Sequence, residues 1–248
     1  HYHQEVSIDS FQMNCDGIWK EGYDFTLKDD HNEISGDLRF EPLSPLGVLV
    51  YYNGRVAVAP SLSQRFYDMF ALKVTGEVEI QGEKLTVQNG RGIIEHGIGI
   101  FSNQDIEDWR WLNLQFPNGS VHLFYHTLNL KEEGILESGE GAAVFDGTWY
   151  HFLRGEFQII EKEYAEEKGI PSKKIPIAWK VIAGNQAGDP LLELEMSVAA
   201  KYSWHSELSM TKEDQSVSNY VLKAEGTWMG KPIKGKGTME NQMHRIIE

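Results

Sequence analysis

Residues 90–128 read GRGIIEHGIGIFSNQDIEDWRWLNLQFPNGSVHLFYHTL and hold the clearest structural signal in the chain. Two runs of alternating, β-branched and aromatic residues flank Pro117-Asn118-Gly119. Asn-Gly is a strong hairpin signal, because both residues tolerate positive φ. The sequence therefore predicts an antiparallel hairpin with Asn118 and Gly119 as its two turn residues.

This turn assigns a register and sorts the side chains into two faces, because side chains along a strand alternate with period two. Phe116 then faces Val121, and Leu112 faces Tyr125. One face carries Asp108, Arg110, Leu112, Leu114, Leu123, Tyr125 and Thr127. The other face carries Trp109, Trp111, Asn113, Gln115, His122, Phe124 and His126. We expect the first face to be apolar near the turn and polar at its far end.

The strand expected before the hairpin, residues 93–100, places a histidine on an apolar side. Ile94, His96 and Ile98 share that side, while Glu95 and two glycines lie on the other. One interpretation is a core histidine with satisfied hydrogen bonds. The other is a titratable group in a hydrophobic cavity, where a pKa near neutrality suits proton transfer. The sequence leaves both open.

Composition limits the classes of partner. The chain has 248 residues, enough for one large β domain or two small ones. Its formal net charge of -14 leaves no basic stripe for nucleic acid or an anionic membrane surface. No apolar run reaches the length of a membrane span. Cys15 is the single cysteine, which excludes an intrachain disulfide and a thiolate zinc site. We expect neither a metal nor a cofactor.

The sequence does not decide the compartment. The chain begins at His1 and shows no signal-peptide pattern, so we expect a processed or trimmed product. A single cysteine is compatible with a reducing compartment, which favours the cytoplasm and leaves localisation open.

Many short strands, few helices and abundant glycine predict an all-β protein of antiparallel sandwiches or barrels. Strands are expected at residues 18–27, 33–40, 48–52, 55–59, 72–81, 84–88, 142–150, 154–164, 175–183, 191–200 and 220–228. Residues 61–70 are expected to form a short helix or an irregular excursion. The polar turn at residues 29–32 is expected to be solvated and not to bind a metal. The polar stretch at residues 131–141 predicts two domains, residues 1–135 and 136–248.

A short internal echo supports two halves of similar build. Gly90-Arg91-Gly92 and Gly235-Lys236-Gly237 each follow a strand and a glycine turn. No helix pattern follows either copy, which argues against a phosphate-binding loop. Strongly bent strands use glycine where neighbours press close, and we expect that role here.

Four segments carry a resemblance to a known family: VTGEVEIQG at 74–82, GRGIIEH at 90–96, the WRW triplet at 109–111 running on to Tyr125, and the glycine-bearing residues 220–240. They resemble the lipocalin-like carotenoid hydratase family and its AttH-like relatives. The resemblance implies two lipocalin-like antiparallel β-barrel domains packed together. It also implies relatives that hydrate isoprenoid chains, to which fungal pericyclases are similar.

The resemblance places the family's catalytic histidine on His96 and its catalytic tyrosine on Tyr125. Three positions depart from the pattern, because Ile98 replaces a tryptophan, Thr127 an aspartate and Arg110 the central acid of a Trp-Asp-Trp triplet. Alkene hydration needs a strong, protected acid and aromatic shelter for a carbocation. These departures disfavour carotenoid hydration by the familiar route.

The leading hypothesis is a cofactor-free enzyme that acts on an isoprenoid, terpenoid or polyketide by acid/base-assisted hydration, isomerisation or cyclisation. His96 would transfer a proton, and Tyr125 would be its hydrogen-bond partner or a second acid. Arg110 would neutralise developing negative charge, and Asp108 would orient Arg110. Substrate contacts are expected from Trp109, Trp111, Ile98, Thr127, Leu112, Leu123 and His126.

Two other classes stay open. A lipocalin-like carrier would hold a lipophilic ligand without changing it, since such barrels are natural containers. An interaction scaffold is the third possibility. In the first two cases the expected partner is a hydrophobic small molecule, and the sequence does not indicate an oligomeric state.

Overall fold

A computed structural model describes residues 2–18, 20–43, 48–50, 63–100, 106–129, 135–166, 174–184, 190–205 and 216–243. These residues form antiparallel strands and turns, with no helix among them. The strands are β1 (Tyr2–Ile8), β2 (Phe11–Ile18), β3 (Gly22–Asp29), β4 (Ile34–Pro42), β5 (Val48–Val50), β6 (Ser63–Ile80), β7 (Glu83–Ile100), β8 (Ile106–Phe116), β9 (Gly119–Asn129), β10 (Ile135–Phe145), β11 (Thr148–Leu153), β12 (Phe157–Glu166), β13 (Lys174–Ala183), β14 (Leu192–His205), β15 (Ser216–Trp228) and β16 (Lys231–Met243). The all-β prediction is confirmed.

The chain forms two compact units. Unit 1 comprises His1–Leu49, Asp68–Glu95 and Gly147–Trp149, and unit 2 comprises Val50–Tyr67, His96–Asp146 and Tyr150–Glu248. This division differs from the expected boundary at residue 135, because β10 begins there and pairs with β9 along its whole length. The expected division into domains of residues 1–135 and 136–248 stays a prediction.

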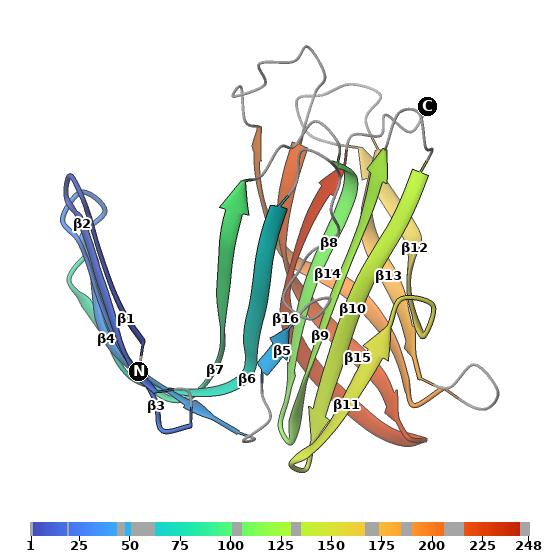
Figure 1. Cartoon of the computed structure of the whole chain (residues 1–248), viewed down its shortest axis with the longest axis horizontal. Helices are drawn as coiled ribbons and strands as arrows, with labels where there is room; N and C mark the ends of the chain where they lie inside the picture. Colours follow the sequence, from blue (N-terminus) through green and yellow to red (C-terminus); the bar gives the residue numbers. More distant parts are fainter. Residues whose placement is uncertain are drawn as a thin grey trace. The chain divides into compact units, whose positions relative to one another are not determined.

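The first sheet has seven strands in the order β1-β2-β3-β4-β6-β5, with β7 paired to β6 (Figure 1). Strand alternation gives it two faces: along β3, Tyr23 and Phe25 are more buried than Asp24 and Thr26. A Cβ at Gly92 would lie 2.8 Å from the Phe40 ring. The glycine-spaced motif of β7 therefore allows close packing, as expected from the sequence.

The second sheet has nine strands in the order β11-β10-β9-β8-β16-β15-β14-β13-β12 (Figure 1). β8 and β12 are five places apart, which in a flat sheet would separate them by about 24 Å. Arg110 of β8 nevertheless lies 2.5 Å from Glu161 of β12. The sheet therefore curls until its distant strands face each other across an interior.

Apolar side chains fill this interior. Leu112, Leu123 and Trp179 have no exposed surface, and Phe145 stacks on Trp228 with ring centroids 4.3 Å apart. The same core cluster takes side chains from β8 through β16. The apolar part of the predicted hairpin face is thus a packed core.

The hairpin of β8 and β9 is confirmed, but its expected register is wrong by two residues. Pro117 and Asn118 form the turn, and Phe116 pairs with Gly119. A Cβ at Gly119 would lie 2.3 Å from the carbonyl oxygen of Val144, so this glycine permits close contact with β10 and is not needed for the turn. A shift of two preserves side-chain alternation, and both predicted faces hold.

The expected short helix at residues 61–70 is wrong from Ser63 onward, where β6 runs for 18 residues. Asp68, Met69, Phe70 and Leu72 are all buried. A strand buried on both sides shows no period-two pattern, which is why the sequence did not read as a strand. The hairpin expected at residues 48–59 lies outside the described residues beyond β5.

Candidate functional site

A polar cluster lies at the far end of the β8–β9 hairpin, on the face that carries the core. Arg110 Nη2 donates to Glu161 Oε1 at 2.5 Å and lies 3.0 Å from Asp108 Oδ2. The exposed fractions of these side chains are 12% for Arg110, 15% for Glu161 and 24% for Asp108. The Tyr164 hydroxyl donates to the other Glu161 oxygen at 2.6 Å. Two carboxylates therefore fix the guanidinium in place.

Tyr125 lies directly opposite Arg110 in the hairpin. Its ring centroid is 5.7 Å from Cζ of Arg110 and 4.6 Å from Cζ of Arg154. Its hydroxyl shares a hydrogen bond of 2.9 Å with Thr127 Oγ1. Guanidinium groups over an aromatic face are attracted by the ring quadrupole, so both arginines hold the orientation of the phenol. We call Asp108, Arg110, Tyr125, Thr127 and Glu161 the Arg110 cluster.

The cluster's formal charges do not cancel. Arg154 pairs with Glu137 at 2.5 Å, while Arg110 meets Asp108 and Glu161. Three formal carboxylates therefore face two guanidiniums. Such a site favours positive charge that develops nearby more than negative charge.

The opposite face of the hairpin buries imidazoles beside aromatic rings. His122 is fully buried and its ring lies 5.1 Å from Trp111, while His126 is 2% exposed and lies 5.1 Å from Phe124. Desolvation by burial lowers the pKa of His126 to about 4, from 6.5. The His126 imidazole is therefore neutral near pH 7.

Glu240 of β16 lies opposite Trp111 on this second face. Burial raises the pKa of its carboxyl above 4.5, and a hydrogen bond from Trp109 opposes the shift. Burial thus disfavours the charged forms of both His126 and Glu240.

The structure divides the sequence-predicted residues into four groups. It brings together Asp108, Arg110, Tyr125 and Thr127. It places Trp109, Trp111 and His126 on the opposite face. It buries Leu112 and Leu123 in the core. His96 and Ile98 belong to β7, and their side chains lie outside the described ones. Sequence reasoning missed Glu161 and Arg154, because pairing between strands that are distant in the sequence brings Arg154 to the hairpin, and curling of the sheet brings Glu161.

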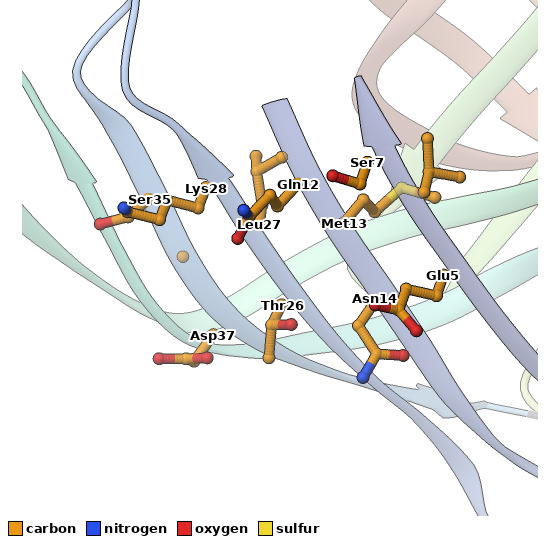
Figure 2. Close-up of a pocket in the computed structure, with 12 residues that line it drawn as sticks. Glu5, Ser7, Gln12, Met13, Asn14, Thr26, Leu27, Lys28, Ser35 and Asp37 are labelled. Atoms are coloured by element: carbon orange, nitrogen blue, oxygen red, sulfur yellow. The ribbon is translucent and has the colours of Figure 1, made fainter. Parts of the chain in front are cut away.

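Unit 1 carries a groove of about 390 Å³ across β1 to β4 (Figure 2). Its side chains include Glu5, Asn14, Thr26 and Asp37. These four are exposed positions of their strands, while the partly buried Val6, Met13 and Leu27 also line the groove, so its lining is mixed.

The polar turn at residues 29–32 is held by its own hydrogen bonds. Asp29 accepts from the backbone N–H groups of His31 and Asn32. Within the described part of the chain, no group of three His, Cys, Asp or Glu residues is placed to hold a metal ion. The turn is thus a local hydrogen-bonded structure, as expected.

This all-β architecture, with a polar cluster beside a packed barrel-like core, is a lipocalin-like fold. The chain is similar to an AttH-like protein from Nitrosomonas europaea, with a TM-score of 0.66 at 16% identity over 96% of this chain and 68% of that one. Kievitone hydratase from Nectria haematococca gives a TM-score of 0.62 at 11% identity over 95% and 69%. CghA with Sch210972 gives 0.62 at 10% identity over 96% and 72%.

These likenesses confirm the fold implied by the sequence resemblance, two lipocalin-like antiparallel β units. No protein-family description and no curated protein matches the sequence. Among the described residues, no helix has the length and apolar character needed to cross a membrane.

Proposed function

We propose that the chain is a cofactor-free enzyme that acts on a hydrophobic isoprenoid, terpenoid or polyketide by acid/base-assisted hydration, isomerisation or cyclisation. The observation that carries the proposal is the Tyr125 phenol, whose ring is contacted by the guanidiniums of Arg110 and Arg154 at the end of an apolar core. Kievitone hydratase, by its name, adds water to kievitone, and it shares this fold. The neighbour supports a hydration reaction without identifying this chain's substrate.

In this proposal the reacting group of the substrate lies beside the Arg110 cluster. It does not lie deep in the core, because Leu112 and Leu123 are buried there among other side chains. Tyr125 donates or accepts a proton at its hydroxyl, with Thr127 as its hydrogen-bond partner. Arg110 positions the phenol ring. The carboxylates of Asp108 and Glu161, which pair with Arg110, favour a cationic reaction centre. The role expected for Arg110 from the sequence, neutralising developing negative charge, stays a prediction.

His96 keeps the proposed role of proton transfer. Its strand leads from unit 1 toward the residues of unit 2, and its backbone belongs to β7. Thr127 is one of the seven predicted substrate contacts. The other six remain proposals for substrate binding or for packing beside the site: Ile98, Trp109, Trp111, Leu112, Leu123 and His126.

Tyr125→Phe tests catalysis, with Tyr150→Phe as the matched control. Tyr150 is partly buried at the opposite end of the same core, where it meets Trp228 edge-on at 4.8 Å. Purified variants are incubated with farnesol, geranylgeraniol and lycopene, and products are followed by liquid chromatography and mass spectrometry. We expect Tyr125→Phe to lower turnover about 100-fold or more, and Tyr150→Phe to keep it.

The rival function is a carrier of a lipophilic ligand, because lipocalin-like barrels are natural containers. Native mass spectrometry of the purified protein separates the two. A co-purified lipophilic molecule that is released unaltered, together with no turnover of the three isoprenoids, supports carriage. Equal turnover in Tyr125→Phe and the parent protein contradicts the proposed role of Tyr125.

A further inference from the structure

Three buried polar groups adjoin the Arg110–Glu161 contact and have no hydrogen-bond partner among the described residues. They are Nε of Arg110, Oδ1 of Asn241 and Nε1 of Trp179. Asn241 is 2% exposed and Trp179 is fully buried. Native proteins leave few such groups unsatisfied, because each forfeits its hydrogen bond to water on burial. We therefore expect these three polar atoms to have a hydrogen-bond partner in a bound ligand.

Their positions follow from the sheet register. Asn241 of β16 lies directly opposite Arg110 of β8. Trp179 of β13 lies directly opposite Glu161 of β12, which contacts Arg110. Directly opposed residues project to the same face of a sheet, so all three groups border one contact across the interior. Asp108, 24% exposed, adjoins it and leaves this end partly open.

The chemistry of the three groups is specific. Arg110 and Trp179 each offer one N–H donor, and Asn241 offers one acceptor. A hydroxyl provides two acceptor lone pairs and one donor, so it can accept from both N–H groups and donate to the Asn241 oxygen. An ether lacks the donor, and a hydrocarbon lacks both. A carboxylate cannot donate and would add negative charge beside Asp108 and Glu161.

We propose that the Arg110 end of unit 2 binds the hydroxyl group of a neutral lipophilic alcohol, phenol or enol, with Asn241 accepting its proton in a hydrogen bond. This inference rests on the proposed function for the location of the ligand. It goes further by naming an oxygenated head group as the feature recognised, and it excludes pure hydrocarbon polyenes as preferred ligands.

A matched series of three probes tests the inference by equilibrium dialysis with gas chromatography. The probes are geraniol, geranyl methyl ether and 2,6-dimethylocta-2,6-diene, which share one skeleton. We expect geraniol to bind about 10-fold more tightly than the ether, and more tightly still than the diene. Equal affinities, or no binding of geraniol, would overturn the inference.

Asn241→Leu and Asn113→Leu supply the matched variants. Both remove a buried carboxamide, but Asn113 lies on the opposite face of β8. We expect Asn241→Leu to reduce the preference for geraniol over its ether to less than about 3-fold, and Asn113→Leu to keep it. A preference that survives in Asn241→Leu overturns the assignment. The parent protein's three affinities decide the matter if either variant does not fold.

Because this experiment measures binding and not turnover, it can contradict the head-group site without contradicting the proposed catalysis, and the reverse. A preference for geraniol with no product formed supports the head-group site and contradicts catalysis on that probe. Turnover without any preference for the hydroxyl contradicts the head-group site alone.

Discussion

At the scale of single residues, His126 shows how burial alters chemistry. Its imidazole is almost fully buried, and neither ring nitrogen has a hydrogen-bond partner among the described residues. The sequence placed this residue on the correct face of its strand, because alternation is local. It could not indicate the depth of burial, which depends on residues distant in the sequence.

Acid should destabilise the protein through His126. The unfolded chain takes up a proton near pH 6.5, whereas the folded chain does so only near pH 4. The stability contribution is therefore lost as pH falls from 6.5 to 4, and the expected loss is about 3 kcal/mol. His126→Phe should remove this loss, as measured by urea unfolding across that pH range.

Glu240 acts in the opposite direction, because burial raises its pKa and its contribution falls as pH rises above 4.5. The comparison of His126→Phe with the parent protein isolates the histidine. The exposed His31, replaced in His31→Gln, provides the substitution control at a histidine outside the core. An identical pH profile in His126→Phe and the parent protein would show that His126 titrates normally.

At the scale of strands, the hairpin illustrates what local patterns can predict. Asp108, Arg110, Tyr125 and Thr127 were placed on one face from the sequence, and the two-residue error in register did not move them off it. Glu161 could not be placed beside Arg110, because no local pattern indicates how far a nine-stranded sheet curls. Sequence periodicity therefore predicts the site residues on the hairpin but not those on strands that are distant in the sequence.

Gly237 should be essential for the pairing of β16 with β8. A Cβ there would lie 1.9 Å from the carbonyl oxygen of Asn113, which is backbone and cannot swing away. We expect Gly237→Ala to cost about 2 kcal/mol or more in urea unfolding. Gly36→Ala is the control, because its Cβ would meet its nearest neighbour at 3.3 Å. Equal losses in both variants would contradict a tight seam between β16 and β8.

At the scale of the whole molecule, composition and glycine spacing predicted two antiparallel β units, and the structural neighbours agree. Which strands join which unit was not predictable, because β8 and β9 precede the polar stretch yet pair with β16 and β10. Local sequence patterns do not indicate which distant strands pair with each other. The fold was therefore recognisable, whereas its partition was not.

The two units offer different candidate surfaces for a ligand. Unit 1 presents a groove of about 390 Å³ with both polar and apolar lining residues. Unit 2 presents the Arg110 cluster, with buried donors and an acceptor that lack partners among the described residues. Unmet hydrogen-bonding capacity makes the second surface the site for a lipophilic alcohol.

A crystal structure of the protein with bound geraniol tests this assignment most directly. We predict density for its hydroxyl oxygen within hydrogen-bond distance of Arg110 Nε and Asn241 Oδ1, with the Tyr125 phenol beside it. Density for geraniol in the groove of β1 to β4, with the Arg110 end closed by side chains, would contradict the account.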